Sequence, residues 1–289
     1  MTRLLTSVAL SALVCSGVAK APQRATFSSG TLGVRVDVLV TKAGRPIAGL
    51  TAEDFEVRDN GVPQRVSLAS VADLPVNAVL VLDTSESTSG PKLTRLVEAA
   101  HGLVDRLHSS DRAALITFSH AVNLRVPSTA DFRLIKKALD EIAPRGETSA
   151  LDAIYVGLLS AQAENGRSLL IVFTDGRDTA SWLTDDEILD AAKRANAVIY
   201  VLAAEHARGW TILRDLAEAT GGHGVDVTAG SDLSDEFQKI LEDFRSRYIL
   251  TFVPAGVAQA GFHRLDVTVR RGGLVVKARP GYIGKDLHE

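Results

Sequence analysis

The fold is decided by residues 78–87, whose sequence is AVLVLDTSES. Five apolar residues lead directly to Asp83, and a second apolar run, residues 169–174, leads in the same way to Asp175. Short, branched runs that are apolar throughout are typical of strands buried on both faces of a parallel sheet. In open α/β sheets, ligands bind beyond the carboxyl ends of such strands. The two runs therefore predict that the two aspartates lie at one shared crevice.

Hydroxyl side chains accompany the two aspartates, and together they form a set of oxygen ligands for one metal ion: Asp83, Ser85, Ser87, Thr148 and Asp175. Mg²⁺ prefers octahedral oxygen coordination at about 2.1 Å, usually with one or two carboxylates. The hydroxyls supply oxygen without cancelling the charge of the ion. Such a site lacks one ligand and stays electrophilic, so we expect it to favour a carboxylate from a protein partner.

This arrangement resembles the von Willebrand factor type A family, in which Asp-x-Ser-x-Ser, a distant Thr and a later Asp-Gly hold the ion of a metal-ion-dependent adhesion site. The resemblance implies Mg²⁺ as the cofactor and a protein ligand that presents Asp or Glu as the partner. Mn²⁺ or Ca²⁺ can also occupy sites rich in oxygen. Taken alone, the motif at 83–87 is more typical of an N-cap cluster before a helix than of a metal site. The order and the strand-end placement of Thr148 and Asp175 favour the metal site.

Strands and helices alternate between residues 77 and 246, which indicates a doubly wound, mostly parallel α/β sheet. The patterns predict helices at 91–108, 131–142, 150–164, 210–220 and 233–246. They predict further strands at 113–119, 121–127, 197–202 and 224–227, the second of these as an antiparallel edge strand.

Both flanking segments, residues 22–76 and 247–289, are rich in β patterns. Asp-Asn-Gly at 59–61 predicts a tight hairpin, with residues 65–69 as the returning strand. Short terminal sheets bury too little surface separately. We therefore expect one small β-sandwich built from both chain ends, with the α/β domain inserted. The segments at 55–61, 248–250 and 279–282 are similar to a bacterial subgroup of exported von Willebrand factor A-related proteins.

Residues 1–21 predict a signal peptide, with an apolar stretch at 4–14 and cleavage after Ala19 or Ala21. The stretch is shorter than the roughly 20 residues that span a bilayer. We expect export to the periplasm, the cell surface or the medium, without membrane insertion of the mature chain. Lipidation of Cys15, the one cysteine in the sequence, is the alternative.

Composition excludes some classes of function. The chain has 289 residues, of which 46% are hydrophobic, so a sizeable core is expected. The formal charge is −3 and no basic block occurs, which argues against nucleic acid as the partner.

Three further residues are candidates for the rim of the site: Glu86, Glu147 and Trp182. Trp182 is expected either as an exposed contact for a partner or as a residue packed onto the next helix. A metal-dependent hydrolase would need Glu147 or Glu86 as its general base, with no histidine in support. We expect a binding module rather than an enzyme, and a structural subunit in which the metal only orders the loops is the alternative.

Overall fold

The computed structural model describes residues 33–69, 74–162, 166–175, 178–203, 210–227 and 232–284. The expected signal peptide, its cleavage sites and Cys15 lie outside the described residues, as does Gly176 of the Asp-Gly pair. Within the described ranges, no helix is both long enough and apolar enough to cross a membrane.

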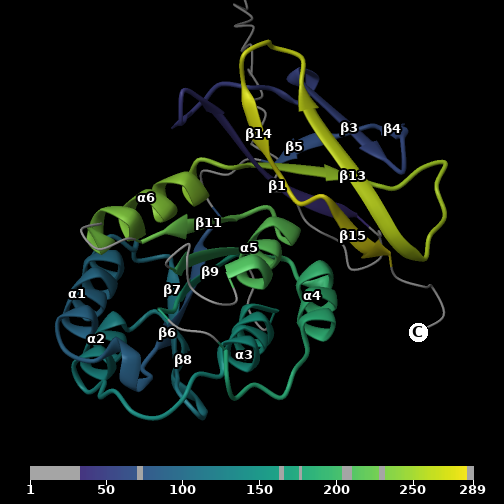
Figure 1. The fold of residues 1–289 in the computed structure, drawn as a ribbon. Helices are drawn as coiled ribbons and strands as arrows, with labels where there is room; N and C mark the ends of the chain where they lie inside the picture. Colours follow the sequence, from purple (N-terminus) through teal and green to yellow (C-terminus); the bar gives the residue numbers. More distant parts are fainter. Residues whose placement is uncertain are drawn as a thin grey trace, which may run out of the picture. The chain divides into compact units, whose positions relative to one another are not determined.

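The central element is a six-stranded sheet with the order β11-β10-β9-β6-β7-β8 (Figure 1). All neighbouring strands are parallel except β8, which is antiparallel to β7 at the edge, as its sequence predicted. The strands are β6 (Val76–Asp83), β7 (Arg112–Phe118), β8 (Val122–Thr129), β9 (Arg167–Phe173), β10 (Ala197–Ala203) and β11 (His223–Asp226). The predicted doubly wound, mostly parallel sheet is confirmed.

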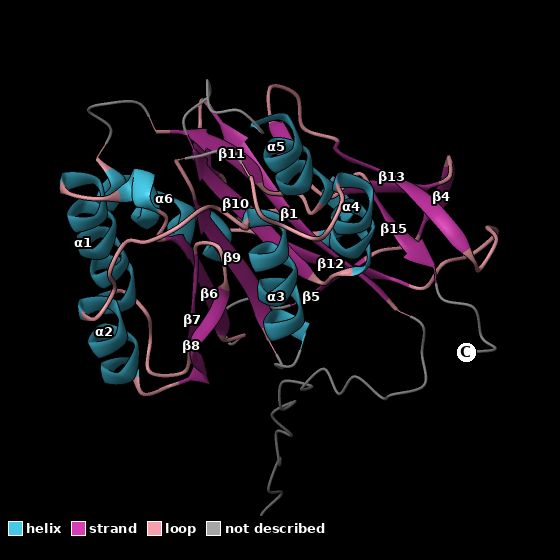
Figure 2. Cartoon of the chain, turned by 60° about the horizontal axis from the view of Figure 1, so that its bottom comes forward, coloured by secondary structure: helices cyan, strands magenta, loops and turns pink. Residues whose placement is uncertain are grey.

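Six helices cover the two faces of this sheet (Figure 2). One face packs against α1 (Pro91–Asp105), α2 (Phe132–Asp140) and α6 (Leu233–Arg245). The other packs against α3 (Ala150–Gln162), α4 (Asp185–Arg194) and α5 (Trp210–Ala219).

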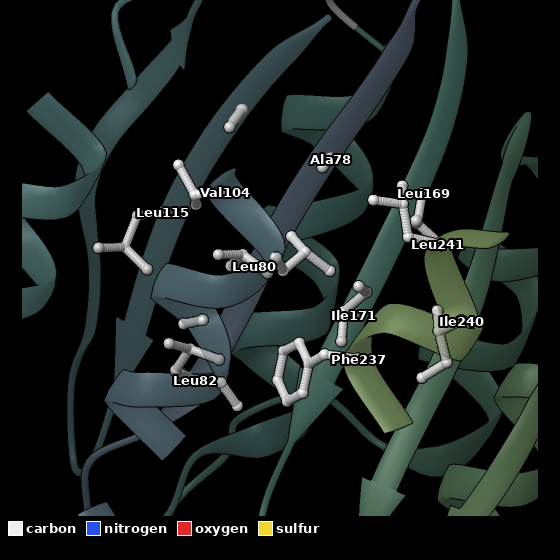
Figure 3. Close-up of a cluster of buried hydrophobic side chains, with 14 of the residues drawn as sticks. Ala78, Leu80, Leu82, Val104, Leu115, Leu169, Ile171, Phe237, Ile240 and Leu241 are labelled. Carbon is white, nitrogen blue, oxygen red and sulfur yellow. The ribbon is translucent and has the colours of Figure 1, made fainter. Parts of the chain in front are cut away.

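Strand β6 shows why its sequence is apolar without alternation. Leu80 and Leu82 point to the face covered by α1 and α6, where Phe237 of α6 joins them (Figure 3). Val79 and Val81 belong to the core on the opposite face. Burial on both faces removes apolar surface from water at every position of the strand, and this requires a continuous apolar run.

Two further sheets combine strands from both chain ends. The first contains β1 (Val34–Lys42), β2 (Arg45–Pro46), β5 (Ser67–Ala69), β12 (Tyr248–Phe252) and β14 (Val275–Lys277). The second contains β3 (Phe55–Asp59), β4 (Val62–Gln64), β13 (Gly261–Val269) and β15 (Gly281–Gly284). Because β1 pairs with β12 and β3 pairs with β13, neither end forms its sheet alone. Residues of both sheets share one hydrophobic core. The fold class predicted from the sequence, an α/β domain within a β-sandwich made from both ends, is therefore confirmed.

The prediction of a hairpin after β3 is correct for the turn and wrong for the returning strand. Asn60 and Gly61 both have positive φ, 48° and 84°, as a two-residue hairpin turn requires. This turn places Val62 directly opposite Asp59, so the returning strand is β4. The segment 67–69, which was expected to return, instead pairs with β12 in the other sheet.

The remaining differences are shifted element ends and short elements that were not predicted. The helix expected to reach residue 108 ends at Asp105, and the helix expected from 131 begins at Phe132 because Asp131 caps it through Arg133 N. A short 3-10 helix, η1 (Ala52–Asp54), precedes β3, and a second, η2 (Glu86–Thr88), follows β6. Strand β15 contains two glycines and carried no strand signal, yet it forms because β13 offers a pairing edge.

The amino ends of the parallel strands contact the sandwich strands through buried arginine. Arg167 at the start of β9 donates from Nη2 to Asp37 Oδ1 of β1 at 3.0 Å and to Phe244 O at 2.8 Å. Arg247, also buried, donates to Tyr200 Oη at 3.0 Å. The opposite, carboxyl ends of these strands therefore form the edge at which the candidate ligands lie.

Candidate functional site

Three loops meet at the carboxyl ends of β6 and β9. The loop after β6 joins the loop before α3 through Glu86 N, which donates to Gly146 O at 3.1 Å. The loop before α3 joins the loop after β9 through Thr179 N, which donates to Thr148 O at 2.8 Å. Backbone hydrogen bonds thus hold the three segments that carry the predicted ligands beside one another.

Three of the five predicted ligands form a continuous chain of oxygen atoms. Ser85 Oγ and Ser87 Oγ are 3.1 Å apart, and Ser87 Oγ donates to Asp175 Oδ1 at 2.7 Å. Ser87 is exposed, whereas Ser85 is buried. Residues separated by 88 positions in the chain are therefore in direct contact at this edge of the sheet.

Asp83 lies beneath this chain of atoms and is fully buried. Its Oδ1 accepts from Ser85 N at 2.8 Å, and its Oδ2 accepts from Thr174 Oγ1 at 2.6 Å. Burial raises the pKa of the Asp83 carboxyl above its usual value, the hydrogen bonds from Ser85 and Thr174 oppose this, and the negative charge of Asp175 raises it further. Two carboxylates in one site, one of them buried, create a local demand for positive charge.

Thr148 is buried, and Thr179 bonds to the Thr148 backbone rather than to the Thr148 hydroxyl. Thr148 N donates to Thr179 Oγ1, and Thr148 O accepts from Thr179 N. The loop that presents Thr148 depends on Gly146, whose φ is +72°. A Cβ atom at this position would lie 2.3 Å from His120 Nδ1. The positive φ therefore favours glycine here, and any larger residue would also have to displace the exposed His120 side chain.

The oxygen spacing is compatible with an octahedral ion. Two ligand atoms at a right angle around Mg²⁺, each about 2.1 Å from it, lie about 3.0 Å apart. The spacings of 3.1 Å and 2.7 Å along Ser85, Ser87 and Asp175 are close to that value. No group of three or more His, Cys, Asp or Glu side chains suited to a metal occurs in the described ranges. Any ion bound here would therefore depend on the hydroxyls.

The three rim candidates are exposed beside these loops. Glu86 lies between the two serines in the chain, and Glu147 directly precedes Thr148. Trp182 is 93% exposed, so it does not pack onto the next helix, which was one of its two expected placements. Single exposed apolar side chains are common on protein surfaces, so what distinguishes Trp182 is how completely its side chain is exposed.

The backbone under Trp182 is firmly held even though its ring is exposed. Asp152, in the first turn of α3, accepts from Trp182 N at 3.0 Å and from Leu183 N at 3.0 Å. Asp178, in the same loop, accepts from Leu151 N at 2.9 Å and from Ser181 Oγ at 2.6 Å. Two carboxylates thus fix the loop to the start of α3.

Two residues near the site were missed by sequence reasoning. Thr174 precedes Asp175 and donates to Asp83, a contact between neighbouring strand ends that only the sheet order reveals. Lys92, in the first turn of α1, places Nζ 2.5 Å from Asp175 Oδ2. In the sequence, a lysine next to Pro91 at the start of a helix indicates only a solvated helix residue, so its contact with Asp175 could not be predicted.

Comparison with known proteins gives consistent matches. The model of the von Willebrand factor type A domain matches residues 77–240. An uncharacterized protein of Synechocystis is 24% identical over 77% of this chain and 58% of its own length. The inter-alpha-trypsin inhibitor heavy chain H2 of Mus musculus is 25% identical over 57% of this chain and 19% of its own length. The chain thus spans less than two thirds of each of these relatives.

Solved structures agree on the fold. A von Willebrand factor type A protein from Catenulispora acidiphila superimposes with a TM-score of 0.54 at 14% identity, covering 89% of this chain and 75% of that one. A mutant of the PilB minor pilin from Streptococcus sanguinis superimposes with a TM-score of 0.51 at 11% identity, covering 73% and 78%. At these identities the similarity concerns the fold alone.

Proposed function

Because this chain belongs to the von Willebrand factor type A family, we propose that it is an exported binding module, not an enzyme, which docks an acidic residue of a protein partner onto a divalent metal ion. Mg²⁺ is the proposed ion, and Mn²⁺ or Ca²⁺ are the proposed substitutes. The proposed ligands are the five residues at the carboxyl edge: Asp83, Ser85, Ser87, Thr148 and Asp175.

The observation that carries the proposal is the oxygen chain from Ser85 through Ser87 to Asp175. Its spacing suits neighbouring ligands of a small octahedral ion. The raised pKa of Asp83 adds a second argument, because a cation beside the two carboxylates would offset both the burial of Asp83 and its repulsion from Asp175. The ion would supply an electrophilic contact for the partner's carboxylate. The serine hydroxyls would hold the ion without adding charge.

The rim residues would decide which partner is accepted. Trp182 offers an exposed aromatic surface on a backbone that is already fixed, so little ordering is needed when it is covered. Glu86 and Glu147 are exposed carboxylates that would repel additional negative charge around the docking residue. We therefore propose a partner with one acidic residue set among apolar or basic neighbours.

Metal binding is tested by titrating the chelator-treated protein with Mg²⁺ in a calorimeter and by thermal melting with and without the ion. We expect saturable binding, and a higher melting temperature, because a ligand that binds only the folded state stabilises it. Ser85→Ala should weaken the affinity at least tenfold. Ser89→Ala, in the same loop and exposed, is the matched control and should bind as the unaltered protein does.

Partner docking is tested by immobilising the protein and passing envelope extract over it in Mg²⁺ or in excess chelator. The proposal requires a captured protein that is lost in chelator and is not retained by the Ser85→Ala protein. Retention in excess chelator would refute metal-mediated docking. Metal-dependent melting without any metal-dependent partner would instead favour the structural role of the ion, and ester hydrolysis that disappears in Glu147→Gln would favour a hydrolase.

A further inference from the structure

Lys92 occupies the acidic side of the candidate metal site. Its Nζ is 2.5 Å from Asp175 Oδ2 and 3.3 Å from Ser87 O. The other oxygen of the same carboxylate, Oδ1, accepts from the Ser87 hydroxyl. Both oxygens of Asp175 are therefore already engaged by groups of this chain, one of them by a positive charge.

The second carboxylate of the site cannot take over this role. Asp83 is fully buried and is held by Ser85 N and by Thr174. Asp175 is thus the carboxylate that an incoming ion must reach first, and its charge is compensated by Lys92. A divalent cation and the ammonium group would have to compete for the same carboxylate, because two cations in contact with one carboxylate repel each other.

The position of Lys92 is unfavourable for the helix that carries it. It lies in the first turn of α1, where the exposed N–H groups disfavour a positive charge, and this turn contains no acidic residue. The helix N-cap is Gly90, which supplies no side-chain cap. The contact with Asp175 is the local interaction that compensates for this placement.

The side chain is also able to leave. It is 52% exposed, whereas the Asp175 side chain is 12% exposed. A flexible lysine stem lets the ammonium move into solvent while its helix stays in place. Departure of Lys92 would open Asp175 to an ion without any change in the backbone.

We propose that Lys92 is a tethered counter-ion that occupies the acidic side of the site in the metal-free protein and lowers its affinity for the divalent ion. This inference rests on the proposed metal site and adds a determinant of its affinity. It implies that the ion enters only where its free concentration is high enough to displace the ammonium. Loading of the site would thereby follow the divalent ion content of the surroundings.

The test compares Mg²⁺ affinities of four chelator-treated proteins by calorimetry: the unaltered chain, Lys92→Gln, Lys92→Arg and Arg95→Gln. Lys92→Gln should bind Mg²⁺ about tenfold more tightly, because the competing charge is gone. Lys92→Arg retains the charge and should stay near the unaltered affinity. Arg95→Gln removes one positive charge from the next turn of α1, where Arg95 Nε contacts Pro91 O rather than the site, and should change the affinity less than twofold.

The outcomes separate the two proposals. Equal or weaker binding by Lys92→Gln would overturn the role of Lys92 and leave the metal site standing. A matching gain in Arg95→Gln would also overturn it, since a general change in charge would then explain the result. Absence of binding in all four proteins would refute the proposed metal site itself, and the inference with it. Thermal melting in the absence of metal verifies that each variant is folded.

Discussion

Opposite charges lie at the two ends of strand β9, and they differ in how they are compensated: one by buried partners, the other by a half-exposed side chain. At the amino end, Arg167 is buried, and its guanidinium is satisfied by Asp37 and Phe244 O and lies over the Phe244 ring. Just beyond the carboxyl end, Asp175 contacts only a serine hydroxyl and a half-exposed lysine among the described residues. One strand thus joins a contact that is closed to solvent with a site that is open to it.

We expect this difference to assign different roles to the two ends of the sheet, stability to the amino end and binding to the carboxyl end. A buried charge is tolerated only when hydrogen bonds and an opposite charge compensate for its lost hydration, as at Arg167. A charge held by a movable partner is available to other ligands once that partner moves away, and this is what we propose for Asp175. Substitutions at the amino end should therefore change the free energy of unfolding, whereas those at the carboxyl end should mainly change binding.

The largest effect is expected from Arg167→Met. It would remove the donor to Phe244 O and leave Asp37 with Arg35 as its remaining charged partner, 3.5 Å away. The free energy of unfolding should fall by about 3 kcal/mol, as measured by urea denaturation. Arg58→Met is the matched control, because its pair with Glu56 is exposed, and it should cost less than about 1 kcal/mol. Equal losses of unfolding free energy in the two variants would show that the buried arginine contributes no more to stability than an exposed ion pair.

A smaller effect is expected from acid at His223, the first residue of β11. Burial, and to a lesser extent the charges of Lys277, Arg247 and Lys239, lower its pKa from 6.5 to about 4. The unfolded chain therefore binds a proton at this residue between pH 6.5 and 4 that the folded chain does not bind. Stability from this source is present above pH 6.5 and is lost as the pH falls toward 4.

The loss should amount to about 2 kcal/mol once the partial exposure of the ring is allowed for. Urea denaturation at several pH values checks it, and the curve for His223→Gln should be flatter over this range. Parallel curves for the two proteins would show that His223 does not contribute. Such a result would contradict the expectation that burial of ionisable side chains at the amino ends of the strands controls stability there.

The smallest effect on stability is expected from Trp182→Ala at the open end. With 93% of the residue exposed, its loss should change the free energy of unfolding by less than about 0.5 kcal/mol. Trp210→Ala is the matched control, because that ring packs against the core under α5, and it should cost about 2 kcal/mol or more. A marked loss in Trp182→Ala would mean that the ring supports the fold rather than a binding surface.

Much of this fold could be predicted from local patterns. The continuous apolar runs before Asp83 and Asp175 predicted parallel strands correctly, because burial on both faces favours apolar side chains at successive positions of a strand. Asn60-Gly61 predicted its turn because few residues adopt positive φ in succession. The strand after that turn was placed wrongly, since residues 62–64 and 67–69 both fit a strand and the choice between them depends on partners far away in the chain.

The candidate site was predictable in its residue types but not in its internal contacts. The five proposed oxygen ligands were identified from motif and order, and their binding of a metal stays a prediction. The hydrogen bond from Thr174 to Asp83 and the ion pair from Lys92 to Asp175 join positions 83 or more residues apart. Neither contact leaves a periodic trace in the sequence.

By itself, the sequence determined the class of the fold, the inserted arrangement of its domains and the residues expected at the carboxyl edge. These features depend on hydrophobic period and turn chemistry, which act between near neighbours. Tertiary structure alone decided that Arg167 meets Asp37, that Trp182 is left in water and that Lys92 neutralises Asp175. Such contacts depend on distance in space, and a long charged or aromatic side chain is compatible with many surroundings until the surrounding chain is in place.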